Sequence, residues 1–78
     1  MKIAITNLNS RTTVDHLKRL LFPFGNVRSV TIEGRDPAGR SSCTGIVRID
    51  YRAGLMAIER LNNLLFMNFY LEVYELTD

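Results

Sequence analysis

Apolar and polar residues alternate along four stretches of the 78-residue chain, and this period of two is typical of half-buried strands. The stretches are residues 2–7, 27–33, 43–51 and 70–74. In the first stretch, Ile3 and Ile5 share one face, whereas Lys2, Ala4 and Thr6 share the other. The pattern therefore predicts a sheet with one apolar face and one open face of mixed character.

Two other stretches place apolar residues three and four positions apart, which is the spacing of a helix face. These residues are Leu17, Leu20, Leu21 and Phe24 in the first stretch, and Ala57, Ile58 and Leu61 in the second. Thr12 and Thr13 can cap the first helix, with Asp15 three residues after Thr12 as a variant of the capping box. Pro23 and Gly25 end this predicted helix.

The predicted elements follow the order β-α-β-β-α-β, which is the split β-α-β arrangement of ferredoxin-like folds. Right-handed crossovers place both helices on the same face of a four-stranded antiparallel sheet. We therefore expect an α+β, ferredoxin-like sandwich that occupies residues 1–78 as one domain. The other face of the sheet stays open, and we expect an extended ligand to lie there.

Length and composition argue against an enzyme. With 46% hydrophobic and 23% charged residues, the chain has the composition of a folded globular domain. A domain of this length has a thin core and little room for a deep cavity. The sequence contains no Gly-rich phosphate loop, paired-carboxylate constellation or Ser-His-Asp order. We therefore expect neither catalysis nor a cofactor.

The single histidine and the single cysteine have no partners for site chemistry. His16 has no carboxylate or cysteine at metal-ligand spacing, so we expect a surface residue rather than a metal ligand. Cys43 has no second cysteine for an internal disulfide, and we expect a small buried residue in a reducing compartment. No stretch resembles a signal peptide or reaches the roughly 20 apolar residues of a membrane helix, so we expect a cytoplasmic protein without membrane contact.

Positive charge is concentrated in the first part of the chain. Ten Lys and Arg residues stand against eight Asp and Glu residues, which gives a net charge of +2. All ten cations lie within residues 1–60, where five acidic residues leave +5. Eight of the ten are Arg, a side chain that binds phosphate in a bidentate manner and stacks on bases. This distribution favours a nucleic-acid partner.

Over nearly its whole length the chain resembles the RNA recognition motif family. Residues 3–8, IAITNL, are similar to the family's first-strand hexamer, except that Ala4 stands where the family has an aromatic residue. The helix-to-second-strand segment is similar at Thr12, Thr13, Leu17, Leu20, Phe24, Gly25, Val27 and Val30. Residues 61–73 resemble the end of the family pattern, so the resemblance implies the same fold.

The family's octamer is much less well matched than its hexamer. Residues 42–49 agree with its specified positions only at Gly45 and Val47. In the family, one hexamer position and two octamer positions carry aromatic rings that stack on bases. In this chain those positions hold Ala4, Thr44 and Ile46. Since each stacked base contributes roughly 1–3 kcal/mol, we expect binding to be weak and of low sequence specificity.

The resemblance and the charge pattern together indicate single-stranded RNA, or single-stranded DNA, as the ligand of the open face. The residues expected to contact it are Lys2, Ala4, Thr6, Arg28, Arg35, Arg40, Thr44, Ile46, Arg48, Tyr70 and Tyr74. Among these, Arg48 is the central candidate because it projects from the middle of the open face. Arg35 and Arg40 belong to a turn-forming loop between the second and third strands.

Each of these side chains also has a purely structural interpretation. An ion pair on the sheet would hold Arg48 in place instead of leaving it for a ligand. The acidic candidates for such a pair are Glu33, Asp50 and Glu72. Tyr70 and Tyr74 are compatible with ordinary cross-strand packing. Arg35 and Arg40 are equally compatible with a loop that only adds solubility.

An apolar run near the end of the chain suggests a second class of function. The candidate interface residues are Leu55, Met56, Leu64, Leu65 and Phe69. A contiguous exposed patch of this kind marks a partner surface. The structural alternative is a local hairpin with Phe66 inserted in the core. The second hypothesis is therefore a dimerisation or protein-docking module that has lost nucleic-acid binding.

Overall fold

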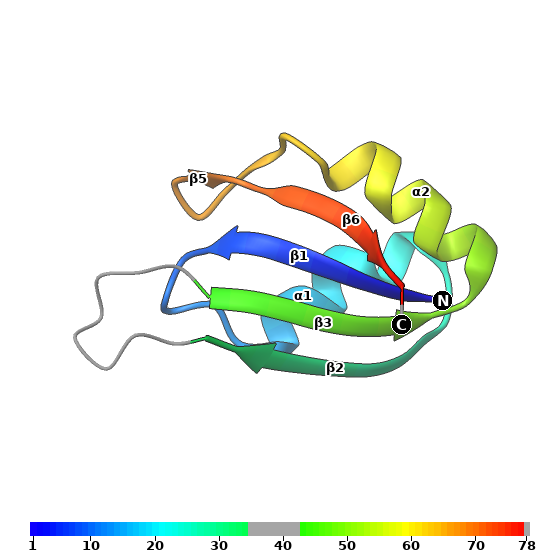
Figure 1. The fold of residues 1–78 in the computed structure, drawn as a ribbon. Helices are drawn as coiled ribbons and strands as arrows, with labels where there is room; N and C mark the ends of the chain where they lie inside the picture. The colour runs from blue at the N-terminus through cyan, green and yellow to red at the C-terminus, as the bar shows by residue number, and fades with distance from the viewer. Residues whose placement is uncertain (35–42, 78) are drawn as a thin grey trace.

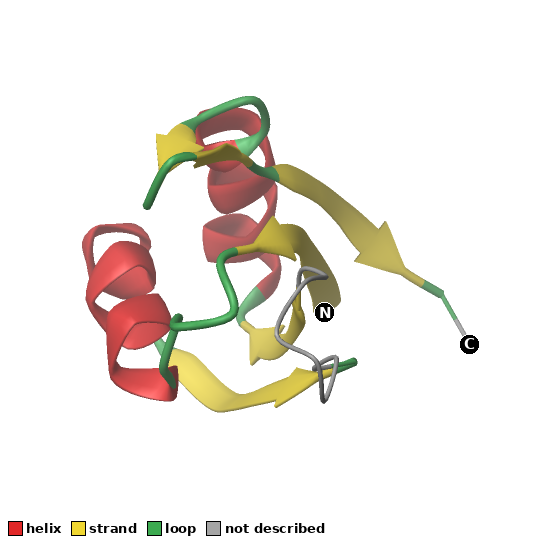
Figure 2. Cartoon of the chain, turned by 90° about the vertical axis from the view of Figure 1, so that its left-hand side faces the viewer, coloured by secondary structure: helices red, strands yellow, loops and turns green. Residues whose placement is uncertain are grey.

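The computed structural model describes residues 1–34 and 43–77. Its elements are β1 (Lys2–Leu8), α1 (Val14–Leu21), the 3-10 turn η1 (Phe22–Phe24), β2 (Val27–Glu33), β3 (Cys43–Ile49), α2 (Tyr51–Leu61), β4 (Leu65–Phe66), β5 (Phe69–Tyr70) and β6 (Glu72–Leu76). Four strands form an antiparallel sheet in the order β2-β3-β1-β6, and both helices cover one of its faces (Figure 1 and Figure 2). The predicted ferredoxin-like α+β fold is confirmed.

The core lies between the sheet and the two helices. Alternate residues of the central strands point into it, so that Ile3, Ile5 and Val47 are fully buried. Leu17 of α1 packs very close to the sheet, because a β-carbon on Gly45 of β3 would come within 2.6 Å of its Cδ1 atom. The missing side chain at Gly45 therefore lets α1 lie directly on the sheet.

A bulge in β1 adjusts the alternation of this strand. The pairing with β3 shifts between Ile5 and Leu8, and Asn7 has a φ of 63°, in the left-handed region. The extra residue turns Leu8 back toward the helices, where it is fully buried. β1 therefore extends one residue beyond the predicted range of 2–7.

The capping box of α1 differs from the predicted one. Thr13 is the N-cap, its Oγ1 accepts a hydrogen bond from the His16 backbone N–H at 3.2 Å, and its own N–H donates to His16 Nδ1 at 3.0 Å. Thr12 is fully buried and directs its hydroxyl toward Met67 Sδ at 3.7 Å. The predicted pairing of Thr12 with Asp15 was wrong because tertiary burial draws Thr12 away from the helix end.

The third strand ends two residues earlier than predicted. β3 ends at Ile49, and Asp50 is the N-cap residue of α2. Tyr51, which the alternation placed in the strand, is instead the first residue of the helix. At its other end α2 stops before Asn62, whose Oδ1 accepts a hydrogen bond from the Val73 N–H at 3.0 Å.

The apolar run after α2 forms a two-stranded hairpin. β4 pairs with β5 through a two-residue turn, in which Met67 and Asn68 have φ values of 49° and 74°. Positive φ at both positions is the signature of a type I′ turn. Two side-chain amides of the β1–α1 segment hold the hairpin, since Asn7 Nδ2 donates to the Tyr70 carbonyl at 2.8 Å and Asn9 Nδ2 to the Met67 carbonyl at 3.0 Å.

Candidate nucleic-acid interface

Strand pairing arranges the open-face residues in three rows across the sheet, which we call the basic, middle and acidic rows. The basic row is Leu76, Lys2, Arg48 and Ser29; the middle row is Tyr74, Ala4, Ile46 and Thr31; the acidic row is Glu72, Thr6, Thr44 and Glu33. Each row runs from β6 across β1 and β3 to β2, and the bulge of β1 interrupts the third. The basic and acidic rows therefore lie at opposite ends of the strands.

Arg48 occupies the centre of the basic row. It is exposed on β3 and lies opposite Lys2 of β1 and Ser29 of β2. Within residues 1–34 and 43–77, its guanidinium forms no hydrogen bond or ion pair. None of the three predicted carboxylate partners holds it, so Arg48 is available to a ligand as far as the described chain is concerned.

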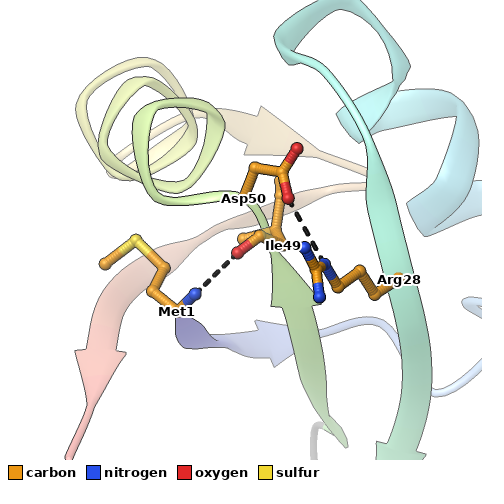
Figure 3. Close-up of polar contacts among 4 residues, drawn as sticks. All are labelled: Met1, Arg28, Ile49 and Asp50. Atoms are coloured by element: carbon orange, nitrogen blue, oxygen red, sulfur yellow. Dashed lines mark hydrogen bonds and ion pairs between the residues drawn. The ribbon is translucent and has the colours of Figure 1, made fainter.

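Arg28 has an acidic partner that the charge pattern did not reveal. Its Nε lies 3.3 Å from Asp50 Oδ1, and the two side chains are 75% and 43% exposed (Figure 3). An exposed pair of this kind contributes only about 0–1 kcal/mol. A phosphate would have to displace Asp50 from the Arg28 guanidinium. Arg28 should therefore contribute less binding free energy than a cation without a partner.

A hollow of about 640 Å³ lies beside the basic row. Its polar lining comes from Lys2, Arg28, Arg48, Asp50, Tyr51, Glu75 and Thr77. Met1 and Ile49 also line it, and two hydrogen bonds between them extend the β1–β3 pairing. The Met1 amino group donates to the Ile49 carbonyl at 2.7 Å (Figure 3), and the Ile49 N–H donates to the Met1 carbonyl at 3.0 Å. Tyr51 was not among the predicted contacts, because strand alternation gave no signal that a helix begins at this residue.

The middle row supplies the apolar centre of the face. Ala4 lies on the open face as predicted, yet only 1% of its surface is exposed. Ile46 and Tyr74 are its cross-strand neighbours on either side. Ala4 therefore offers a ligand little surface of its own, and its contact with RNA stays a prediction. Tyr74 remains 47% exposed and brings an aromatic ring beside the position where the family's ring is missing.

Tyr70 does not belong to the four-stranded sheet. The alternation predicted it on the last strand beside Tyr74, but β6 begins only at Glu72, and Tyr70 pairs with Leu65 in the hairpin. The correction has a physical reason, because the tight turn at Met67 and Asn68 folds the chain back on itself before it enters the sheet. Tyr70 is still exposed, at the edge of the face rather than on it.

Both ends of the acidic row carry an exposed carboxylate. Glu72 lies on the edge strand β6 opposite Thr6, and Glu33 lies on the other edge strand opposite Thr44. The Thr6 hydroxyl donates to the backbone carbonyl of Glu72 at 3.2 Å and so leaves the carboxylate unused. Phosphates are therefore repelled from this end of the face and attracted to the other.

Charge is divided unevenly between the two sides of the molecule. On the described sheet and its ends, the cations are Lys2, Arg28 and Arg48, and the carboxylates are Glu33, Asp50, Glu72 and Glu75. The helices and the turn before α1 carry Arg11, Lys18, Arg19, Arg52 and Arg60 against Asp15 and Glu59. Among the residues that the structure describes, the excess of positive charge thus lies on the helical side. Arg35 and Arg40, also predicted as contacts, lie outside the described residues.

The predicted apolar interface residues are all exposed but lie on two elements. Leu55 and Met56 lie on α2, whereas Leu64, Leu65 and Phe69 lie in or next to the hairpin beyond its end (Figure 1). The hairpin alternative was also correct, because Phe66 packs against the core. Sequence analysis missed Phe22, which is 80% exposed at the end of α1.

His16 and Cys43 have structural positions. His16 is half-buried and completes the helix cap, so it does more than the surface residue that was predicted. Cys43 is buried in the core. Among the residues that the structure describes, no three His, Cys, Asp or Glu side chains gather to hold a metal ion, and neither helix is long and apolar enough to cross a membrane.

Comparisons with known proteins agree with this architecture. A family model described as RNA recognition motif matches residues 3–72. The crystal structure of RNA binding protein PG1 is 33% identical, with a TM-score of 0.86 over 100% of this chain and 95% of that one. The Pes4 RRM3 structure is 26% identical, with a TM-score of 0.85 over 99% and 92%. The structure of Rna15 RRM with bound RNA (GU) shares the fold at 16% identity, with a TM-score of 0.79 over 99% and 83%. The search of curated proteins found no match.

Proposed function

Since this chain belongs to the RNA recognition motif family, we propose that it binds single-stranded RNA on the open face of its sheet, weakly and with little overall sequence preference. The family consists of RNA-binding domains rather than enzymes, so the role of the domain is binding and not catalysis. The observation that carries the proposal is Arg48, which is exposed in the basic row at one end of the open face and has no partner among the described residues.

Two kinds of contact support this mode of binding. Arg48 and Lys2 in the basic row attract the phosphates of a strand, and Arg can also stack on a base plane. Tyr74 in the middle row provides a ring on which one base stacks, beside the apolar surface of Ile46. Thr6 and Thr44 supply hydroxyl groups in the acidic row. Rna15 RRM, which has the same fold, was solved with RNA bound, and this supports RNA as the ligand.

Three features limit the affinity. Tyr74 is the one aromatic residue on the described strands of the four-stranded sheet. Arg28 is already paired with Asp50. Cations on the described sheet do not outnumber carboxylates, so long-range attraction of a polyanion is small. We expect a Kd on the order of 10⁻⁴ to 10⁻⁶ M at physiological salt, in the range of non-specific contacts.

An NMR titration with short RNA of mixed sequence at low salt tests the proposal. Backbone amide shifts are expected around Arg48, Thr6 and Ile46, because these residues lie on the open face. Arg48→Glu should weaken binding about tenfold or more, since it replaces a phosphate contact by a repulsion. The matched control is Arg19→Glu on α1, which changes net charge equally on the helical side.

Two results would count against RNA binding by the open face. Amides of the face that stay unchanged at millimolar RNA would remove the proposed site. Equal weakening by Arg48→Glu and Arg19→Glu would mean diffuse charge attraction without a defined surface. Repeating the titration with DNA of the same sequence distinguishes the two ligands, because only RNA offers a 2′-hydroxyl.

A protein-interaction role is a second candidate, supported by one observation. All five predicted interface residues expose between 38% and 56% of their surface despite the small size of the domain. They lie on α2 and the hairpin, away from the open face, so both functions are compatible.

A further inference from the structure

Tyr74 and Glu72 project side by side from the edge strand β6. They are two residues apart, and Val73 between them is buried in the core, so both point to the open face. Two residues of a strand span about 6.7 Å. This distance fits a base that stacks on the Tyr74 ring and directs its Watson–Crick edge toward Glu72.

Ala4 gives Tyr74 the room to act as a stacking platform. Its methyl group is the cross-strand neighbour of Tyr74 and does not rise above the sheet. Because β6 is an edge strand, no further strand hinders a base from entering at its outer side. Tyr74 thus brings a ring next to the position at which the family's first-strand ring is absent.

The Glu72 carboxylate is a free acceptor within the described chain. It forms no ion pair there, and the Thr6 hydroxyl bonds the Glu72 backbone rather than the carboxylate. An ionised carboxylate only accepts hydrogen bonds. Guanine offers two parallel donors, N1–H and N2–H, to its two oxygens. Adenine and cytosine offer one amino group beside an acceptor nitrogen, and the single N–H of uracil lies between two carbonyl oxygens that repel a carboxylate.

We propose that Glu72 selects guanine at one position of the bound strand, with the base stacked on Tyr74. This inference rests on RNA binding by the open face. It adds a preference for one base at one position, while the other positions of the strand accept any base. The acidic row repels phosphates, so the backbone crosses toward Arg48 and Lys2 while the base edge turns to Glu72. The strand therefore binds with a defined orientation.

Glu33 provides a matched control for Glu72. It is also an exposed carboxylate at an edge of the acidic row, and its nearest open-face neighbour on the same strand is Thr31 rather than an aromatic residue. Glu33→Gln and Glu72→Gln remove the same charge and so raise the general affinity for RNA alike. Only Glu72→Gln should alter the choice of base.

The experiment compares three five-nucleotide RNAs, UUGUU, UUIUU and UUUUU, where I is inosine and lacks only the N2 amino group of guanine. Kd values are measured by NMR titration for the unchanged protein and both variants. We expect the guanine oligomer to bind at least about fivefold more tightly than the inosine oligomer. This ratio should fall close to one in Glu72→Gln and stay unchanged in Glu33→Gln.

The possible outcomes separate the two proposals. Binding of all three oligomers with a guanine-to-inosine ratio near one would overturn the role of Glu72 and leave RNA binding intact. A ratio that persists in Glu72→Gln would overturn it as well. Amides of the open face that respond to none of the oligomers would overturn both proposals together.

Discussion

Asn7 links a local backbone conformation to two distant parts of the molecule. Its positive φ allows the bulge that directs Leu8 into the core, and its side-chain amide holds the hairpin at the Tyr70 carbonyl. Asn tolerates the left-handed region better than most residues with a β-carbon. The alternation in the sequence predicted the strand, but it gave no sign of the bulge, since an added residue is a property of strand pairing.

Replacing Asn7 tests which of these two roles matters more for stability. Asn7→Ala should lower the free energy of unfolding by about 1–2 kcal/mol, because it strains the backbone and removes the hydrogen bond. Asn7→Gly removes the same bond but accepts the positive φ, so it should cost less. Urea unfolding of the three proteins measures the difference. Equal losses in both variants would assign the whole effect to the hydrogen bond.

At the scale of elements, the local pattern predicted which helices and strands exist, and in what order, more reliably than the residues at which they begin and end. The start of α1 depends on Thr13 and His16, whereas the sequence alone also allowed a cap at Thr12. Thr12 is buried instead, and its hydroxyl contacts Met67, far along the chain. Tyr51 moved from a predicted strand to a helix for a similar reason, since the alternation continues past the point where pairing ends.

The capping box of α1 makes a quantitative prediction for stability. Thr13→Ala should lower the free energy of unfolding by about 1 kcal/mol, because the His16 N–H loses its acceptor at the helix end. Thr13→Ser keeps a hydroxyl at this position and should stay close to the unchanged protein. Thermal unfolding followed by circular dichroism compares the two variants. A Ser variant as unstable as the Ala variant would mean that the Thr methyl group, rather than the cap, stabilises the helix.

At the scale of the whole molecule, the open face and the helical side differ in charge and in exposed apolar surface. Among the described residues, the excess of positive charge lies on the helical side, while the open face has one basic and one acidic end. Exposed apolar residues cluster on α2 and the hairpin. The molecule therefore offers two separate surfaces, one suited to a strand of RNA and one suited to an apolar partner.

If the apolar surface joins two copies of the chain, the sedimentation coefficient should rise with protein concentration. Leu65→Ser should prevent this rise, because Leu65 is among the most exposed residues of that surface. Phe22→Ser is the control, since it removes an even more exposed apolar group at the end of α1, outside that surface. A single monomeric species at every concentration would exclude the dimer.

The sequence by itself determined the order of strands and helices, the core face of each strand and the membership in a family, because these follow from local periodicity and short motifs. The placement of Arg48 on the open face also follows from alternation alone, although strand pairing puts it in the row at one end of that face rather than in its middle. Only the tertiary structure decided that Arg28 pairs with Asp50, 22 positions away, and that Ala4 is buried between the strands that carry Tyr74 and Ile46. Ion pairs and cross-strand neighbours join residues that are distant along the chain, so no local pattern contains them.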